Sequence, residues 1–170
     1  MALSMYQASI PPILQALQAA HAMLGKAAAH AEAQKFDPAI LLTYRLSPTQ
    51  FAFTRQVQIM ADFAKGGGAR LAGVDSPKMP DVEVSFPELQ ARLDATAAFL
   101  RTLTPAQIDG TEDKVITIKV AGNEMTFAGQ AYLLGFVMPN VYFHFTTAYA
   151  ILRHNGVDVG KRDYMGTPPV

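Results

Sequence analysis

Residues 125–152 read MTFAGQAYLLGFVMPNVYFHFTTAYAIL and carry no formally charged side chain. About 20 apolar residues are enough to span a bilayer, so the length of this run needs an explanation. Polar residues interrupt the run, Pro139 breaks it, and no aromatic belt or basic flank marks both of its ends. We therefore expect no membrane span, but a helix that is buried on several sides within a bundle.

The middle of this run contains Pro139-Asn140-x-x-x-His144. Asn140 and His144 are four residues apart, so on a helix they project from one face and are predicted to be buried polar groups. Pro139 removes the donor for the Gly135 carbonyl, which predicts a kink. Two interpretations of His144 stay open. With an ordinary pKa of about 6.5 it suits a general base or a ligand contact, and it also suits a hydrogen-bonded packing role.

The bulk composition excludes several classes of function. The chain has 170 residues, half of them hydrophobic, which is enough for one domain over residues 1–170. Its 14 basic and 14 acidic residues cancel, so no long-range field favours nucleic acid or an anionic membrane. The absence of cysteine excludes disulfides and thiolate chemistry. Residues 1–6 lack the pattern of a signal peptide, and we expect a cytoplasmic protein.

Helix start and stop signals predict four helices. Ser9 is the predicted cap of the first, over residues 11–34, with Pro11 and Pro12 in its first turn. Residues 47–50 (SPTQ) form a capping box that predicts the start of the second, and residues 85–88 (SFPE) do the same for the third, over residues 86–103. Residues 104–107 (TPAQ) predict one extra turn that Gly110 ends.

The second predicted helix has two unlike faces. The polar face is expected to be solvated, and Gln56 is a polar exception on the apolar face. Gly66, Gly67 and Gly68 weaken the helix, so either another backbone approaches there or the helix bends. The polar face consists of Arg55, Gln58, Asp62 and Lys65, and the apolar face of Ala52, Gln56, Met60, Phe63 and Gly67.

The alternating residues 115–120 and 125–127 flank a turn at residues 121–124 and predict a small β-hairpin. The fourth helix follows over residues 128–154 and ends at Asn155-Gly156, a pair suited to a left-handed cap. The predicted fold class is therefore all-α, a four-helix bundle with a small β-hairpin before the last helix. The loop lengths permit more than a simple up-down-up-down order.

The last predicted helix resembles that of the DinB-like (YfiT-like) superfamily of helical bundles. That superfamily typically carries His-x-x-x-His there, then a Leu-Arg pair and a closing glycine, which compare with Asn140-x-x-x-His144 and with ILRHNGV at residues 151–157. The resemblance spans most of the chain. The chain resembles one bacterial branch of this superfamily, of unknown function, more closely. The resemblance to that branch lies in SMYQAS (residues 4–9), RQVQ (residues 55–58) and TAYAILRHNG (residues 147–156).

The resemblance implies a dimeric bundle with a cavity at one end. In the metal-binding members three histidines, one on helix two and two on helix four, hold a divalent metal. Here His144 matches the second of the helix-four histidines, Asn140 matches the first, and Gln56 matches the helix-two position. Amides bind zinc-like ions far more weakly than imidazole does, so we expect no tight metal and no cofactor. His21 is a possible second imidazole, although no spacing requires it.

Three hypotheses of function follow, and none assigns a reaction. The first is a dimer that binds a small molecule in a cavity lined by helices two and four, near Gln56, Asn140 and His144. Tyr44 and Arg162, from a loop and the tail, are expected to close over one end of the bundle. The second is a degenerate metal-dependent hydrolase or thiol transferase of the DinB type. The third is a structural or stress-associated dimer that joins through its apolar helical surface.

Overall fold

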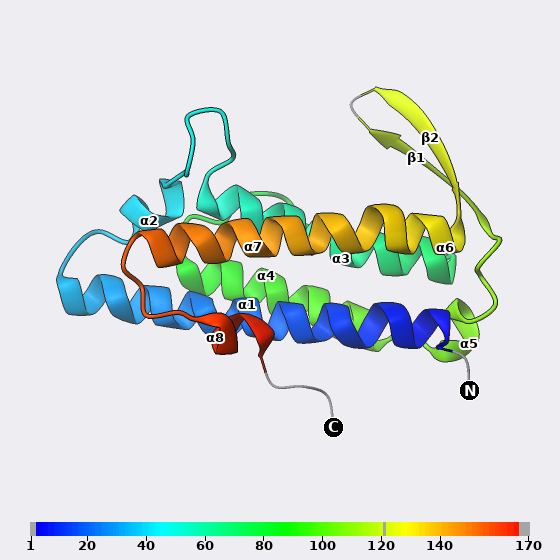
Figure 1. Cartoon of the computed structure of the whole chain (residues 1–170), viewed down its shortest axis with the longest axis horizontal. Helices are drawn as coiled ribbons and strands as arrows, with labels where there is room; N and C mark the ends of the chain where they lie inside the picture. The colour runs from blue at the N-terminus through cyan, green and yellow to red at the C-terminus, as the bar shows by residue number, and fades with distance from the viewer. Residues whose placement is uncertain (1–2, 121, 167–170) are drawn as a thin grey trace.

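The computed structural model describes residues 3–120 and 122–166, and it is a bundle of long helices with a small hairpin beside it (Figure 1). The predicted fold class is confirmed. The last long helix is a continuous rod made of α6, the π-helical turn η1 and α7. The elements of the bundle are α1 (Met5–Gln34), α3 (Phe53–Ala72), α4 (Phe86–Arg101), α6 (Gly129–Tyr132), η1 (Leu133–Val137) and α7 (Met138–His154).

Each long helix packs along two others. Helix α1 lies against α4 and α7, and α3 lies against α7 and α4. Helices α1 and α7 run in one direction and α3 and α4 in the other (Figure 1), so α3 and α4 are parallel neighbours. Parallel neighbours need a long connection, and residues 73–85 return along the bundle to provide it. The order is therefore not up-down-up-down.

Helix α1 begins earlier than its prolines suggest. Ser4 caps it through a capping box with Gln7, and Pro11 and Pro12 lie inside the helix. Ser9 is not the cap, because its hydroxyl is buried and donates to the Met5 carbonyl at 2.7 Å. The predicted start at residue 11 is wrong, since a good capping box upstream outweighs the two donors that proline removes.

The predicted start of the second helix is also wrong. Residues 47–50 form a turn closed by the Gln50 N–H and the Ser47 carbonyl at 3.0 Å, after the short helix α2 (Ala39–Thr43). Helix α3 begins at Phe53, whose N–H donates to the Tyr44 carbonyl at 2.9 Å. A tertiary hydrogen bond thus satisfies a first-turn donor that a side-chain cap would otherwise take.

The three consecutive glycines lie within the unbroken helix α3, and the nearest atoms to them belong to side chains, not to another backbone. A Cβ on Gly67 would lie 2.5 Å from Cγ1 of Val137 in η1, and one on Gly68 would lie 2.7 Å from Cδ2 of Leu100 in α4. Side chains of both neighbouring helices therefore fill the space that the missing Cβ atoms leave. Glycine allows α3 to approach α4 and η1 at the same level of the bundle.

The two later capping signals are confirmed. Ser85 caps α4, and Thr104 caps α5 (Pro105–Ile108) through a capping box with Gln107. The last helix ends at Asn155 and Gly156, and Gly156 has the expected left-handed φ of 81°. Among the helices of the described residues, none combines the length and apolarity that crossing a membrane requires.

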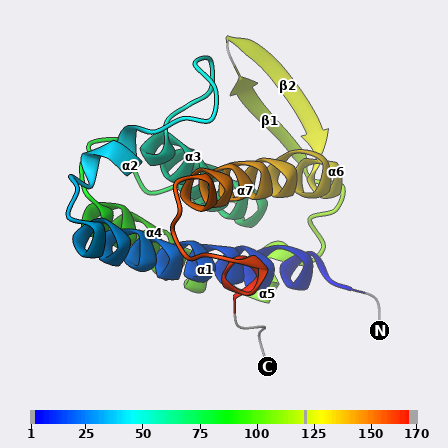
Figure 2. The same cartoon turned by 60° about the vertical axis from the view of Figure 1, so that its left-hand side comes forward.

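The hairpin stands beside the end of the bundle where α6 begins (Figure 2). Its strands are β1 (Val115–Val120) and β2 (Asn123–Ala128), with Val120 opposite Asn123. The predicted turn at residues 121–124 is therefore too long, because Asn123 belongs to β2; Ala121 lies outside the described residues. Ile116 and Ile118 are the buried residues of β1 and attach the hairpin to the core.

The last helix changes to a π-helical turn before Pro139. The Met138 N–H donates to the Leu133 carbonyl, five residues earlier, and Pro139 follows in the first turn of α7. The extra residue in η1 shifts the register just before a residue that has no N–H to donate. Where the sequence predicts a kink at Pro139, the structure shows a π turn just before it.

Candidate functional site

Gln56 of α3 and His144 of α7 form a buried pair, called here the amide–imidazole pair. Nδ1 of His144 lies 2.7 Å from Oε1 of Gln56, and the two residues are 7% and 1% exposed. Nε2 of Gln56 donates to the Phe51 carbonyl at 3.0 Å, so its Oε1 is the atom that accepts. The imidazole therefore carries its proton on Nδ1 and keeps the Nε2 lone pair.

Burial keeps this imidazole neutral, and two aromatic rings pack against it. The ring of Phe63 stacks on His144 with centroids 5.9 Å apart, and the ring of Phe143 meets it edge-on at 5.2 Å. Burial, with a smaller contribution from the positive charge of Arg55, lowers the pKa of His144 from 6.5 to about 4. At neutral pH the group is a weak base with one free lone pair.

Asn140 is not a member of the pair. Its Nδ2 donates to the Phe136 carbonyl at 2.7 Å, so the amide is bound to its own helix next to the π turn. Among the described residues, the hydrogen-bond partner of His144 is Gln56 from the facing helix. The four-residue spacing correctly predicts that Asn140 and His144 project from one side of the helix, but it does not predict the hydrogen-bond partner of either side chain.

The remaining predicted site residues lie elsewhere. Tyr44 packs on His154 near the end of α7, with ring centroids 5.7 Å apart. Arg162 is exposed on α8 (Lys161–Met165), which packs on α1. His21 lies on the α1–α4 side, with its Nε2 3.4 Å from an Asp94 oxygen. The structure does not bring these three side chains to the amide–imidazole pair.

The three positions that match metal ligands in the superfamily do not fit a zinc-like ion here. Oε1 of Gln56 is bound to His144, and the Asn140 amide is bound to a backbone carbonyl. Two amides and one imidazole are also a weak ligand set. Across residues 3–120 and 122–166, no group of three or more His, Asp or Glu side chains is arranged to hold a metal.

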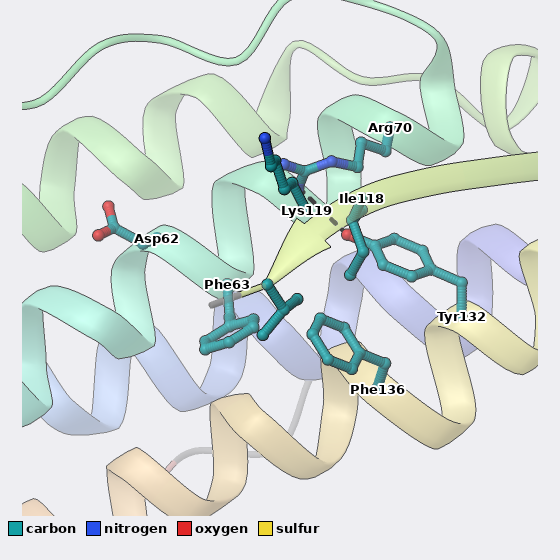
Figure 3. A pocket seen from close by; sticks show the side chains of 8 residues that line it. Asp62, Phe63, Arg70, Ile118, Lys119, Tyr132 and Phe136 are labelled. Carbon is teal, nitrogen blue, oxygen red and sulfur yellow. Dashed lines mark hydrogen bonds between the residues drawn. The ribbon is translucent and has the colours of Figure 1, made fainter. Parts of the chain in front are cut away.

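A cleft of about 360 Å³ adjoins the pair, between α3, β1 and the α6–η1 segment (Figure 3). Phe63 links the two, because its ring stacks on His144 and also lines the cleft. This space is called here the hairpin cleft. Its lining residues are Asp62, Phe63, Arg70, Ile118, Lys119, Val120, Tyr132 and Phe136.

Three aromatic rings form one side of the hairpin cleft. Phe136 meets Phe63 edge-on at 5.5 Å and stacks on Tyr132 at 5.8 Å. The Tyr132 hydroxyl accepts a hydrogen bond from Nη1 of Arg70 at 3.2 Å. Sequence reasoning missed Arg70, Lys119 and Tyr132 as site residues. For Arg70 a signal existed in the glycine run four residues before it.

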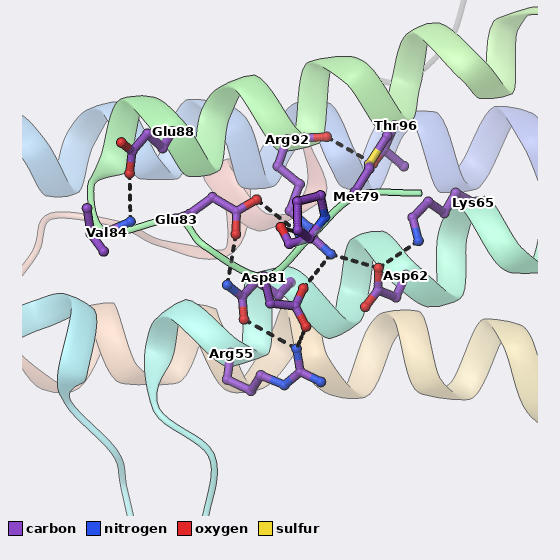
Figure 4. Close-up of polar contacts among 12 residues, drawn as sticks. Arg55, Asp62, Lys65, Met79, Asp81, Glu83, Val84, Glu88, Arg92 and Thr96 are labelled. Atoms are coloured by element: carbon purple, nitrogen blue, oxygen red, sulfur yellow. Dashed lines mark hydrogen bonds and ion pairs between the residues drawn. The ribbon is translucent and has the colours of Figure 1, made fainter. Parts of the chain in front are cut away.

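A second buried polar group lies on the opposite face of α3, around Arg92 of α4 (Figure 4). Its guanidinium donates to Glu83 at 2.9 Å and to Asp62 at 2.7 Å, and it lies 2.8 Å from an Asp81 oxygen. These four residues are called here the Arg92 cluster. Arg55 also pairs with Asp81, which ties the loop before α4 to α3.

The prediction that this face of α3 is solvated is correct only in part. Beneath the loop, Gln58 is 5% exposed and the Arg92 side chain 1%, whereas the side chains of Arg55 and Asp62 are still 39% and 35% exposed. Burial alone would lower the pKa of Arg92, but the hydrogen bond to Glu83 and the nearby carboxylates outweigh it and raise the pKa. Burial likewise opposes ionisation of Glu83, and hydrogen bonds from Arg92 and Gln58 lower its pKa nonetheless.

Comparisons with known proteins agree with this architecture. Residues 5–165 match the family model described as a domain of unknown function (DUF1993). Among solved structures, the chain is similar to the crystal structure of a DinB family member protein from Shewanella denitrificans, at 38% sequence identity and a TM-score of 0.87. That alignment covers 97% of this chain and 93% of the other. A comparison with curated proteins gave no match.

Proposed function

Because this chain belongs to the DUF1993 family and has the fold of a DinB family member, we propose that it binds a small organic molecule in the hairpin cleft. One observation carries the proposal: three aromatic rings line a space of about 360 Å³ that no described side chain fills. Pockets for small organic ligands typically have about 300–1,000 Å³ and mostly apolar walls with a few polar groups. The proposal assigns no reaction.

The walls of the cleft support a ligand with a flat, apolar body. Phe63 and Phe136 come from facing helices, and Ile118 and Val120 come from β1 above them. Stacked and edge-on rings at 5–6 Å are favourable contacts that an aromatic ligand would extend. In this proposal His144 does not touch the ligand. It is a positioning residue, because its ring fixes one face of Phe63.

Filling the cleft tests the proposal. Val120 lines the cleft from the outer part of β1 and is 38% exposed, so Val120→Trp places an indole in the space with little change to the core. Val115→Trp is the matched control, since Val115 is 73% exposed on the same strand and does not line the cleft. The probes are bicyclic aromatic fragments, including 2-naphthamide, followed by ligand-detected NMR.

We expect 2-naphthamide or related fragments to bind with a dissociation constant of about 1 mM or tighter, as suits ligands of this size. Binding should persist in Val115→Trp and be lost in Val120→Trp. Equal binding to both variants would place the fragments outside the cleft, and no binding of any bicyclic fragment to the unmodified protein would overturn the proposal.

A second proposal, homodimerisation, rests on the outward face of the last helix. Leu134 and Phe143 are 53% and 59% exposed, and Pro139 and Thr146 lie exposed between and beyond them. No charged side chain belongs to this stretch. An uncharged face matches a second copy of itself, because a twofold axis would bring like surfaces together without burying an unpaired charge. This face favours a structural dimer.

Phe143→Glu tests the dimer, with Val84→Glu as the control on the 76% exposed loop residue Val84. We expect the unmodified protein and the control to sediment at twice the chain mass of 18.4 kDa. Phe143→Glu should sediment at the single mass, because the new charge would be buried without a partner. A monomeric unmodified protein at 0.1 mM would contradict dimerisation.

A further inference from the structure

The charges around the hairpin cleft do not balance, although those of the whole chain do. The charged residues that line the cleft are Asp62, Arg70 and Lys119. The carboxylate of Asp62 is already bound by Arg92 at 2.7 Å and Lys65 at 2.8 Å. Asp62 therefore contributes little free negative charge to the cleft.

The two cations of the cleft have no such compensation. Within the described part of the chain, no acidic side chain lies within 4.0 Å of Arg70 or Lys119. Glu124 is opposite Lys119 in the hairpin register, yet it is not within ion-pair distance. The cleft thus presents net positive charge beside apolar rings.

The Arg70 side chain is held in place by two features. Nη1 of its guanidinium donates to the Tyr132 hydroxyl, and it lies over Gly66, one helical turn earlier. A Cβ on Gly66 would lie 2.6 Å from that Nη1, so any other residue there would displace the guanidinium. Glycine in a helix interior is unfavourable by about 1 kcal/mol relative to alanine, and here it makes room for a cation.

Tyr132 supplies a further donor. Its oxygen accepts from Arg70, and the hydroxyl hydrogen, on a side chain that is 1% exposed, has no acceptor among the described residues. Burial raises the pKa of Tyr132, and the opposing effect of Arg70 is smaller, so the phenol stays protonated at neutral pH. A protonated phenol beside a guanidinium is a suitable pair of donors for an oxyanion.

A second, more open hollow lies on the other side of Arg70. It is lined by Arg70 and Asp62 together with the basic residues Lys65 and Lys78. Lys65 is paired with Asp62, whereas Lys78 has no acidic side chain within 4.0 Å among the described residues. Positive charge therefore approaches Arg70 from both sides.

We propose that the hairpin cleft is specific for an organic oxyanion, a carboxylate or phosphate monoester on an aromatic or similarly flat body. The oxyanion lies between Arg70, Lys119 and the Tyr132 hydroxyl, and the body lies on Phe63 and Phe136. This inference rests on the proposed function, since it requires that the cleft take a ligand. Beyond the proposed function, it specifies that the ligand is negatively charged and names the residues that bind this charge.

Two probes of the same shape but different charge separate the effect of ligand charge on affinity from that of ligand shape. The first, 2-naphthoate, carries a carboxylate, and the second, 2-naphthamide, carries a neutral amide on the same rings. The chain has no tryptophan, so naphthalene fluorescence can be followed without protein background from that residue. We expect 2-naphthoate to bind at least about tenfold more tightly, because hydrogen bonds to charged groups are about twice as strong as neutral ones.

Two variants identify the cation. Arg70→Gln removes the guanidinium, and Gly66→Ala keeps it but moves it, while raising the helix propensity of α3. Both should lower 2-naphthoate affinity several-fold, toward that of 2-naphthamide, and leave 2-naphthamide binding unchanged, since Lys119 remains in both variants. Arg101→Gln, an exposed arginine at the end of α4, is the matched control and should retain the preference.

The outcomes are distinct. If neither naphthalene probe binds, the proposed function fails and the inference with it. If both bind equally, the cleft takes a ligand but the oxyanion specificity is overturned. If 2-naphthoate is preferred and Arg70→Gln keeps that preference, the assignment to Arg70 is overturned. A third probe, 2-naphthyl phosphate, then decides which oxyanion is bound more tightly.

Discussion

Helix α3 carries two buried polar groups on opposite faces, and they differ in charge. On one face the amide–imidazole pair joins Gln56 to His144 by a single hydrogen bond of 2.7 Å between neutral groups. On the other face the Arg92 cluster holds a guanidinium, 1% exposed, among three carboxylates. One contact fixes α3 to α7, and the other fixes α3 to α4 and to the loop between them.

The difference in charge determines what happens when one partner is lost. Leaving a buried neutral donor without an acceptor costs the folded state about 1–3 kcal/mol, the desolvation penalty of that group. Leaving a buried charge without its counter-charge costs more, because the charge has lost its hydration and no partner offsets that loss. The Arg92 cluster should therefore be the more sensitive of the two, although α3 contributes a side chain to both.

The largest effect is expected for Arg92→Met. Methionine keeps much of the side-chain length but removes the cation, so Asp62, Asp81 and Glu83 lose their common partner. We expect the free energy of unfolding to fall by about 3 kcal/mol, the lower end of the range for a broken buried pair, measured by urea denaturation at pH 7. Glu83, 11% exposed, loses its cation, whereas Asp62 keeps Lys65 and Asp81 keeps Arg55. Arg101→Met, at an exposed position on the same helix, is the control and should change stability by less than about 0.5 kcal/mol. Equal losses in the two variants would show that Arg92 contributes no more to stability than an exposed arginine does.

The next effect is a dependence of stability on pH. Because the pKa of His144 in the folded protein, about 4, is below the ordinary 6.5, the folded state favours the neutral imidazole. That contribution is present above pH 6.5 and is lost as the pH falls toward 4, by about 3 kcal/mol in total. Glu83 behaves differently, since its lowered pKa gives stability that is present above 4.5 and is lost only below that value.

Urea denaturation at several pH values between 7.5 and 4.5 checks this window, with His144→Gln for comparison. The three other histidines remain in both proteins, so the difference in slope reports His144. We expect the unmodified protein to lose stability across this range and the variant to lose much less. Parallel curves would mean that His144 titrates normally and is not buried as a neutral group.

The contrast also explains which parts of the fold the sequence predicts. The hairpin, the caps at Ser85 and Thr104 and the stop at Gly156 depend on local chemistry, and all are confirmed. The starts at residues 11 and 47 are wrong, because a second capping signal or a tertiary hydrogen bond decides them. A local pattern shows that a cap is available and does not show which cap is used.

The same reasoning applies to the candidate site. Gln56 and His144 are visible in the sequence because each is polar on an apolar face. Arg92 and its carboxylates are not, because charged residues on one face of a helix have the pattern of a solvated surface. Only the return path of residues 73–85, which is a long-range property, covers that face. For the same reason Lys119, on a separate hairpin, was not associated with Arg70.

A smaller effect is expected for the amide–imidazole pair. Gln56→Leu leaves the Nδ1–H of His144 without its acceptor and should lower the free energy of unfolding by about 1–3 kcal/mol. Combining it with His144→Phe replaces both partners by apolar groups of similar size, and part of the loss should return. A double variant that loses as much as the two single variants together would show that the hydrogen bond is not the reason for the loss.

The smallest effect is expected next to the Arg92 cluster, at Lys65, which pairs with Asp62. Its ammonium lies 2.8 Å from the same Asp62 oxygen that Arg92 binds at 2.7 Å. Lys65→Met keeps the apolar stem and leaves Asp62 paired with Arg92, so stability should fall by only about 0.2–1 kcal/mol. The loss should disappear in 1 M NaCl, where screening weakens a partly exposed pair, whereas the loss in Arg92→Met should persist. A larger, salt-insensitive loss would mean that Lys65 also neutralises buried charge, and the contrast between the two faces of α3 would then extend beyond Arg92.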